Sequence, residues 1–333
     1  MAVALALSVA ACAAWPRVLS RGFRQLESRL LLPETDVWRN LPQTGEVHVS
    51  FQDVLLIAGG TGISCLRLDG NTVWQRDVPL EEPHAAAAGR SAVVWTRAGT
   101  LLLADRAGCR ETAVSSGIDW AVPREDGGAL VLTAGSGYLG ELLTLDRDGT
   151  VLERRGETDR VPLWSDGRGN DCYGNLNGQW SLQTEEGEAL FPAPILGMCP
   201  LKGGFGLWTG EQICLYDAAG TRQVRDPLGG ARVTAWSGDE ALALALQREG
   251  RWILEILDFQ GAIRRTELPG KPREIAVCGD FVCVLDSAGL RVYDYHGKMA
   301  EYLPEFAWAD GMIRSDLGLI LLMDGKFLVH RLP

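Results

Sequence analysis

Short runs of alternating apolar and polar residues, separated by Asp/Gly turns, fill the chain from Thr35 onward. The clearest unit runs through Cys65–Leu68, the turn Asp69–Gly70 and Thr72–Trp74. Such alternation indicates a strand with one buried face, and an Asp-Gly turn between two such runs indicates a hairpin. Asp accepts hydrogen bonds from the turn backbone, and Gly adopts the positive φ angle that closes it. The pattern therefore predicts an all-β chain.

The hairpin unit recurs along the chain with variation. The intervals between successive copies are 36, 41, 38, 33, 41 and 36 residues, counted at Asp69, Asp105, Asp146, Thr184 (a degenerate copy), Asp217, Asp258 and Asp294. A further apolar run precedes several copies, as at Ser91–Trp95, Ala129–Leu132, Glu240–Ala245 and Phe281–Leu285. We expect these runs to be central strands buried on both faces. A period near 40 residues with several short strands is typical of a β-propeller of four-stranded blades.

The two ends of the repeat region predict how the ring closes. Thr35–Pro42 is similar to the outer strand at Asn71–Pro79, but no blade precedes it. Gly318–Leu322 and Lys326–Leu332 are similar to blade strands with no outer strand after them. We expect the N-terminal strand to pair into the C-terminal blade, which removes an exposed sheet edge. Seven hairpin units plus this closing blade predict eight blades. Seven blades remain the alternative, because residues 156–187 are irregular.

Three segments follow from the distribution of apolar and charged residues. We expect residues 1–20 to form a hydrophobic membrane anchor or signal-like segment, of nearly the ~20 residues that a span needs. We expect residues 21–33 to form a short helical stalk that ends at Pro33, and residues 34–333 to form the propeller. We expect a membrane-anchored protein with an extracytoplasmic propeller. The cytoplasmic side is the alternative by the positive-inside rule, because Arg17, Arg21, Arg24 and Arg29 follow the apolar segment. A buried or frayed N-terminal helix without a membrane role is a further alternative.

Composition narrows the possible functions. The formal net charge of −11 and a pI near 5.0 argue against nucleic acid as a partner, because phosphates require a Lys/Arg patch. The eight Cys form no CxxC pair and the four His are scattered, so we expect no metal site of that kind. The alternating Asp residues at 146–149 and 166–171 lack the full ligand set of a calcium loop. We therefore expect no bound metal.

The unit Leu-Asp-x-x-Gly-x-x-x-Trp resembles the repeats of pyrroloquinoline quinone-like (quinoprotein-type) β-propellers, and the resemblance covers Thr35–Pro333. That superfamily includes quinoprotein dehydrogenases and also cofactor-free scaffold propellers. The chain looks closest to anchored propellers of unknown function from Gram-positive bacteria. The vicinal Cys pair that covers the quinone is absent, and few copies carry the Thr-Gly before a packing Trp. The resemblance therefore implies the fold without the quinone, and we expect no cofactor.

Four tryptophans fall in the runs that we expect to open four of the repeats. The opening strand of a blade is the innermost, so an aromatic ring there is placed to stack on a sugar or another flat ligand. The alternative is that these rings pack between adjacent blades, as large aromatic side chains commonly do. Three of the four have an Asp one or two residues away, which supports ligand binding. The candidate ligand-binding residues are Trp120, Trp164, Trp236, Trp308, Asp119, Asp166 and Asp310.

No constellation of residues specifies a reaction. Glycoside hydrolysis needs paired carboxylates and acyl transfer needs a Ser/His/Asp set, and neither stands out in the sequence. We therefore predict a non-catalytic propeller at the cell envelope that acts as a protein-interaction scaffold or a ligand-binding module. We expect it to bind a protein partner, and to contact the membrane through residues 1–20. The alternative function is a carbohydrate-active enzyme with its site at the channel mouth of the propeller.

Overall fold

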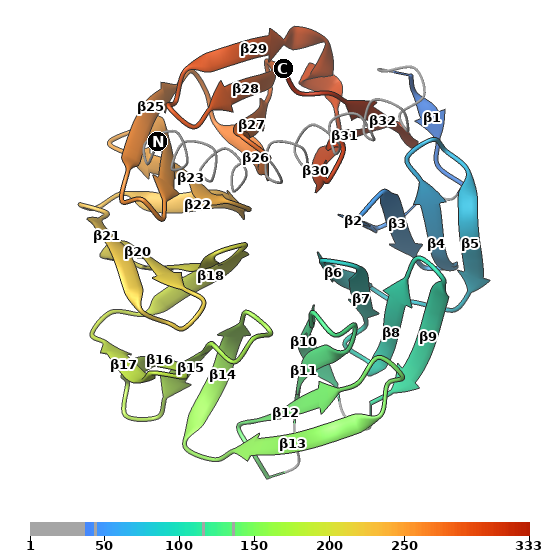
Figure 1. The fold of residues 1–333 in the computed structure, drawn as a ribbon, viewed down its shortest axis with the longest axis vertical. Helices are drawn as coiled ribbons and strands as arrows, with labels where there is room; N and C mark the ends of the chain where they lie inside the picture. The colour runs from blue at the N-terminus through green and yellow to red at the C-terminus, as the bar shows by residue number, and fades with distance from the viewer. Residues whose placement is uncertain (1–36, 43–44, 115–116, 135–136) are drawn as a thin grey trace, which may run out of the picture.

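The computed structural model describes residues 37–42, 45–114, 117–134 and 137–333, and shows eight four-stranded antiparallel sheets arranged as a ring (Figure 1). The chain is a β-propeller. The prediction of eight blades is confirmed, and the seven-blade alternative is excluded. Residues 1–20 and 21–33, the predicted anchor and helical stalk, lie outside the described residues. No helix within the described ranges is long and apolar enough to cross a membrane.

Each of the first four blades is built from four consecutive strands, ordered from the ring centre outward. Blade 1 comprises β2 (Val47–Phe51), β3 (Val54–Gly59), β4 (Gly62–Arg67) and β5 (Thr72–Asp77). Blade 2 comprises β6 (His84–Ala88), β7 (Ser91–Trp95), β8 (Thr100–Asp105) and β9 (Gly108–Ala113). Blade 3 comprises β10 (Ile118–Pro123), β11 (Ala129–Thr133), β12 (Gly140–Leu145) and β13 (Val151–Glu157). Blade 4 comprises β14 (Arg160–Ser165), β15 (Asp171–Asn175), β16 (Trp180–Thr184) and β17 (Gly187–Phe191).

The remaining blades follow the same order, and the last one also takes a strand from the start of the chain. Blade 5 comprises β18 (Ile195–Leu201), β19 (Gly204–Thr209), β20 (Gln212–Asp217) and β21 (Arg222–Pro227). Blade 6 comprises β22 (Arg232–Gly238), β23 (Ala241–Arg248), β24 (Arg251–Asp258) and β25 (Ile263–Leu268). Blade 7 comprises β26 (Pro272–Cys278), β27 (Phe281–Asp286), β28 (Gly289–Asp294) and β29 (Met299–Leu303). Blade 8 comprises β30 (Gly311–Ser315), β31 (Gly318–Met323), β32 (Lys326–His330) and β1 (Arg39–Asn40).

The recurring Asp/Gly units are the hairpins that join the third and fourth strands of blades 1 to 7. At the turn between β12 and β13, Asp146 Oδ1 accepts hydrogen bonds from the backbone N–H groups of Asp148 and Thr150, each at 2.8 Å. Gly149 adopts a φ of 82°, which a residue with a side chain rarely adopts. The local chemistry of Asp and Gly therefore closes this hairpin through hydrogen bonds within a few residues.

The ring closes as the repeat pattern predicts. Strand β1 pairs antiparallel with β32, with Arg39 opposite Phe327 and Asn40 opposite Lys326. Next to this strand, Trp38 lies edge-on to Phe306 with 6.4 Å between ring centroids. The N-terminal strand thus supplies the outer edge of the last blade. Closure leaves no unpaired blade at which the ring could open.

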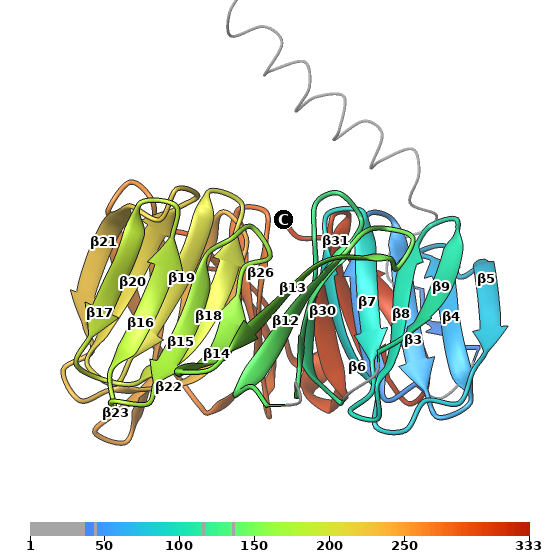
Figure 2. The ribbon, with the colours of Figure 1, turned by 90° about the horizontal axis from the view of Figure 1, so that it is seen from below.

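The segments between strands define two faces of the disc, which Figure 2 shows edge-on. The turns that join the first to the second strand of a blade, and the third to the fourth, lie on one side, which we call the turn face. The connections between the second and third strands, and those between blades, lie on the other side, which we call the loop face. The central strands are largely buried, and β7 is buried along its full length. Their apolar side chains pack into clusters between neighbouring blades.

Candidate functional site

Three of the four predicted tryptophans lie on innermost strands, as expected. Trp120 lies on β10, Trp164 on β14 and Trp236 on β22. The expected strand position of Trp308 is wrong, because this residue ends a 3-10 helix, η1 (Pro304–Trp308), the only helical segment among the described residues. Proline at the start of η1 has no N–H to offer a strand pair and suits the first turn of a helix. Trp308 is 82% exposed on the loop between blades 7 and 8.

The packing of these rings differs from one to the next. Trp120 packs against the apolar cluster between blades 2 and 3, and Trp164 against the cluster between blades 4 and 5. Packing between blades, the alternative to ligand binding, therefore holds for these two rings. Trp236 is 48% exposed, and its ring lies 4.9 Å from that of Trp208. Of the four predicted tryptophans, only Trp236 and Trp308 offer substantial ring surface to a ligand.

The seven predicted residues do not form one site, because they lie on both faces of the disc. Trp164, Asp166 and Trp236 lie near the turn face; Asp119, Trp120, Trp308 and Asp310 lie near the loop face. Asp166 is buried and serves its own turn. Its carboxylate accepts hydrogen bonds from the N–H of Arg168 at 2.7 Å and from the side-chain amide of Asn170 at 2.6 Å. Burial raises the pKa of Asp166.

Asp310 is the predicted residue that lines a cavity. The cavity has a volume of about 430 Å³ and lies on the loop face at the inner rim of blades 7, 8 and 1. We call it the channel-mouth pocket. Its polar lining combines three carboxylates with one imidazole and one ammonium group: Glu46, Glu274, Asp310, His48 and Lys326. Its apolar lining is Leu41, Met312, Ile313, Leu322 and Met323.

The geometry of the pocket holds two of its titratable groups in half-buried positions. Glu274 Oε2 accepts a hydrogen bond from the backbone N–H of Met312 at 2.6 Å, across the boundary between blades 7 and 8. Burial raises the pKa of Glu274, and this hydrogen bond acts in the opposite direction. His48 Nε2 is buried and has no hydrogen-bond partner among the described residues. Burial lowers the pKa of His48, so the imidazole is neutral at pH 7.

Two glycines leave the room that these side chains occupy. A Cβ atom at position 311 would lie 3.2 Å from Glu274 Oε1, and one at position 45 would clash first with the Ile57 side chain and would also lie 3.1 Å from His48 Nε2. Both distances are tighter than ordinary van der Waals contact. Gly45 and Gly311 therefore allow a carboxyl group and an imidazole to enter the same rim of the ring. The pocket depends on small residues as much as on its charged ones.

The charge balance of the channel-mouth pocket indicates what it can bind. Three carboxylates face one ammonium group, while the imidazole is neutral. Such a lining suits a cationic group, and the apolar wall suits an aliphatic stem that carries it. The sequence pattern singled out Asp310 and missed Glu46, His48 and Glu274. Glu46 and Glu274 are far apart in the chain, and only closure of the ring brings blades 7, 8 and 1 together.

The loop face also carries exposed apolar side chains over blades 3 to 5. Two backbone hydrogen bonds hold their loops together, from Leu139 N–H to Glu157 O at 2.7 Å and from Leu176 N–H to Asp159 O at 3.1 Å. Leu176 is 69% exposed. Exposed apolar groups that gather on one face of a soluble domain commonly mark an interaction site. We call this set the apolar rim: Tyr138, Leu139, Val161, Leu176 and Leu196.

Comparison with known proteins identifies the fold. No protein-family model matches the chain, and no curated protein matches its sequence. The structure is similar to that of BamB from Moraxella catarrhalis, with a TM-score of 0.56 and 15% identity over 90% of this chain and 99% of that one. It is also similar to Saccharomyces cerevisiae Sqt1, with a TM-score of 0.55 and 9% identity over 91% of this chain and 100% of that one. At these identities the similarity shows the β-propeller fold that the repeats predict, and nothing about function.

Proposed function

We propose that this protein is a non-catalytic β-propeller that binds a protein partner through its loop face. The observation that carries the proposal is the channel-mouth pocket, in which three carboxylates and an apolar wall lie at the inner rim of that face. The partner presents a lysine or arginine side chain to this pocket. Its aliphatic stem packs on the apolar wall, and its cationic head pairs with Asp310 and Glu46.

Two further observations support a protein partner. The apolar rim lies on the same face as the pocket, so one partner that covers the face buries both. Interfaces of this kind combine an apolar core with charged groups that select the partner. The net charge of −11 also favours association with a basic surface.

Site-specific crosslinking in native cells tests the proposal. A photoreactive benzoylphenylalanine replaces Leu176 on the apolar rim, or Trp308 beside the channel-mouth pocket. Ala219, exposed on the turn face, is the matched control position. We expect the same protein adduct from both loop-face positions and none from Ala219. Asp310→Asn combined with Glu46→Gln should reduce the yield severalfold. Equal adducts from the turn face, or no change in the charge variant, would contradict the proposal.

We also propose that the protein works at the cell envelope, with residues 1–20 as its membrane anchor and the propeller on the extracytoplasmic side. The support is the apolar sequence of that segment and the resemblance of the repeats to anchored bacterial propellers. Protease added to intact cells should degrade the propeller while a cytoplasmic marker survives. Protection of the propeller until the cells are lysed would place it on the cytoplasmic side instead.

A carbohydrate-active enzyme is the second candidate, and one observation favours it. Glu274, whose pKa burial raises, shares the channel-mouth pocket with Asp310, and glycoside hydrolysis uses two carboxyl groups, of which the general acid has a raised pKa. The test is release of nitrophenol from a panel of nitrophenyl glycosides. Hydrolysis that Glu274→Gln abolishes, with the fold retained, would establish the enzyme. Absence of turnover across the panel supports the binding function.

A further inference from the structure

The interface between blades 3 and 4 is built differently from the others. Clusters of buried apolar side chains fill seven of the eight inter-blade interfaces among the described residues, between blades 1 and 2, 2 and 3, 4 and 5, 5 and 6, 6 and 7, 7 and 8, and 8 and 1. No such cluster joins blade 3 to blade 4 in the described part of the chain. Apolar packing between blades is what holds a propeller together. Its absence at one interface needs a reason.

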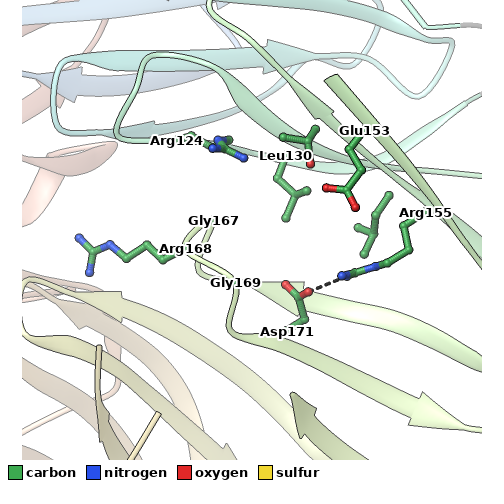
Figure 3. Close-up of a pocket in the computed structure, with 10 residues that line it drawn as sticks. Arg124, Leu130, Glu153, Arg155, Gly167, Arg168, Gly169 and Asp171 are labelled. Carbon is green, nitrogen blue, oxygen red and sulfur yellow. Dashed lines mark hydrogen bonds and ion pairs between the residues drawn. The ribbon is translucent and has the colours of Figure 1, made fainter. Parts of the chain in front are cut away.

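A polar cavity of about 260 Å³ occupies this interface and opens beside the turn face (Figure 3). We call it the inter-blade cleft. Blade 3 contributes Arg124, Glu153 and Arg155 together with apolar and hydroxyl side chains of its middle strands. Blade 4 contributes Asp171 and the turn of residues 167–169. The cleft therefore has walls from two sheets, with charged groups on both.

A hydrogen-bonded network holds one wall of the cleft in place. Arg155 Nη2 donates to Asp171 Oδ2 and to the Tyr173 hydroxyl, each at 2.7 Å, and Arg155 Nε pairs with Glu157 at 3.2 Å. The Arg160 guanidinium lies 3.9 Å from the centre of the Tyr173 ring and also pairs with Glu157, at 2.8 Å. These contacts join β13 of blade 3 to β15 of blade 4. They fix the orientation of the Asp171 carboxylate.

Two polar atoms of the cleft lack partners. Asp171 is 5% exposed, and its Oδ1 has no hydrogen-bond partner among the described residues. Figure 3 shows this oxygen turned away from Arg155, on the side of the cleft. Arg124 Nε, across the cleft, is likewise buried without a partner in the described ranges. Buried polar atoms are normally hydrogen-bonded, so an unpaired acceptor and an unpaired donor on residues that line one cavity point to a missing polar partner there.

We propose that the inter-blade cleft binds a small zwitterion in which an ammonium group neighbours a carboxylate, as in a free α-amino acid. Asp171 Oδ1 and Glu153 accept hydrogen bonds from the ammonium group, and Arg124 Nε donates to the carboxylate. Leu130, Leu142 and Thr144 pack against the carbon skeleton. The cavity is smaller than the 300–1,000 Å³ typical of pockets for drug-sized molecules, which limits the ligand to a small molecule such as an amino acid.

The missing apolar cluster agrees with a binding role for this interface. A site that must stay open and polar gives up packing that the other interfaces keep, and sites of this kind commonly trade stability for function. A larger apolar side chain in the cleft should therefore stabilise the fold and block binding together. Thr144→Leu is such a change, because Thr144 lies on β12 facing the cleft. A residue that served only to fill the interface would not show this pairing of effects.

Thermal-shift and calorimetric titration of the full-length protein test the proposal. The probes are the twenty amino acids at 10 mM. The controls are ethylamine, which carries only the ammonium group, acetate, which carries only the carboxylate, and glucose, which carries neither. We expect at least one amino acid to raise the melting temperature and to bind in calorimetry, and the three controls to do neither. An equal response to glucose, or no response to any amino acid, would overturn the proposal.

Variants locate the binding. Asp171→Asn should lower the affinity for the amino acid at least tenfold, and Glu153→Gln should lower it severalfold. Glu188→Gln, an exposed carboxylate on β17 of blade 4, is the matched control and should bind as wild type. Thr144→Leu should abolish binding while its melting temperature stays at or above that of wild type. Wild-type affinity in both Asp171→Asn and Thr144→Leu would show that the ligand binds elsewhere.

Discussion

Two buried carboxylates that share one arginine make the stability of the propeller depend on pH. Glu255 on β24 is 1% exposed, and its Oε2 accepts a hydrogen bond from Arg265 Nε at 2.6 Å. The same guanidinium pairs with Asp226 on β21 of the neighbouring blade. Glu255 Oε1 is buried without a partner in the described part of the chain. Burial, with Asp226 nearby, raises the pKa of Glu255 from 4.5 to about 7 against the opposing effect of Arg265.

The sign of the effect follows from the protons that each state binds. Between pH 4.5 and about 7 the folded protein keeps a proton on Glu255 that the unfolded chain has released. Stability therefore falls as the pH rises through this window and becomes independent of this group above it. At about 1.4 kcal/mol for each pKa unit, the loss is about 3 kcal/mol as an upper bound. In a chain of this length that corresponds to roughly 4 °C in the melting temperature.

Glu255→Gln tests this reasoning, because glutamine mimics the protonated carboxyl group and cannot ionise. Melting temperatures of the variant and the wild type are compared from pH 4.5 to 8. We expect the two to agree at pH 4.5 and the variant to melt roughly 4 °C higher at pH 8. Other titrating groups are common to both proteins and cancel in the difference. Glu267→Gln, on the adjacent strand and exposed, is the control and should show no such trend. A constant difference across the pH range would refute the reasoning.

Three further predictions concern ring closure, backbone conformation and thiol chemistry. Trp38→Ala removes the ring that packs on Phe306 beside the closing strand, and should lower the unfolding free energy by about 2 kcal/mol in urea titration and speed proteolysis at β1. Gly204→Ala should lower the unfolding free energy by about 1–3 kcal/mol, because φ is +152° there and the new Cβ would meet a facing carbonyl. Gly210→Ala is the control, and it should change the melting temperature little because the space around it is open. Burial raises the pKa of the Cys65 thiol to about 12, so iodoacetamide at pH 8 should alkylate it only after unfolding, and rapid labelling of the native protein would contradict this.

The architecture could be predicted because its signals are local. Each Asp/Gly hairpin closes through hydrogen bonds within a few residues, as at Asp146, and its recurrence sets the blade count. The closing strand was predictable from the similarity of Thr35–Pro42 to an outer strand, and β1 confirms it. Trp308 was placed wrongly because its run resembles a strand, whereas Pro304 starts a helical turn. This proline therefore had more influence on the local structure than the apolar pattern around it.

The candidate site was predictable only in part. Asp310 was identified from its position beside Trp308, and it lines the channel-mouth pocket. Glu46, His48 and Glu274 carry no local signal, because a single polar residue in an inner strand has many structural explanations. The clustering of these groups depends on three blades that meet only when the ring is closed. The inter-blade cleft was likewise invisible, since Asp171 belongs to a run that the sequence suggested only as an incomplete calcium loop.

The sequence by itself determined the strands, the hairpins, the period and the way the ring closes, because each depends on hydrogen bonds and φ angles within a short stretch of chain. The tertiary structure decided which tryptophans pack between blades, which carboxylates share a pocket, and that one interface in the described chain holds a polar cleft in place of an apolar cluster. These outcomes depend on the faces that neighbouring blades present to each other. Residues such as Arg155 and Asp171 acquire their roles only when two sheets meet.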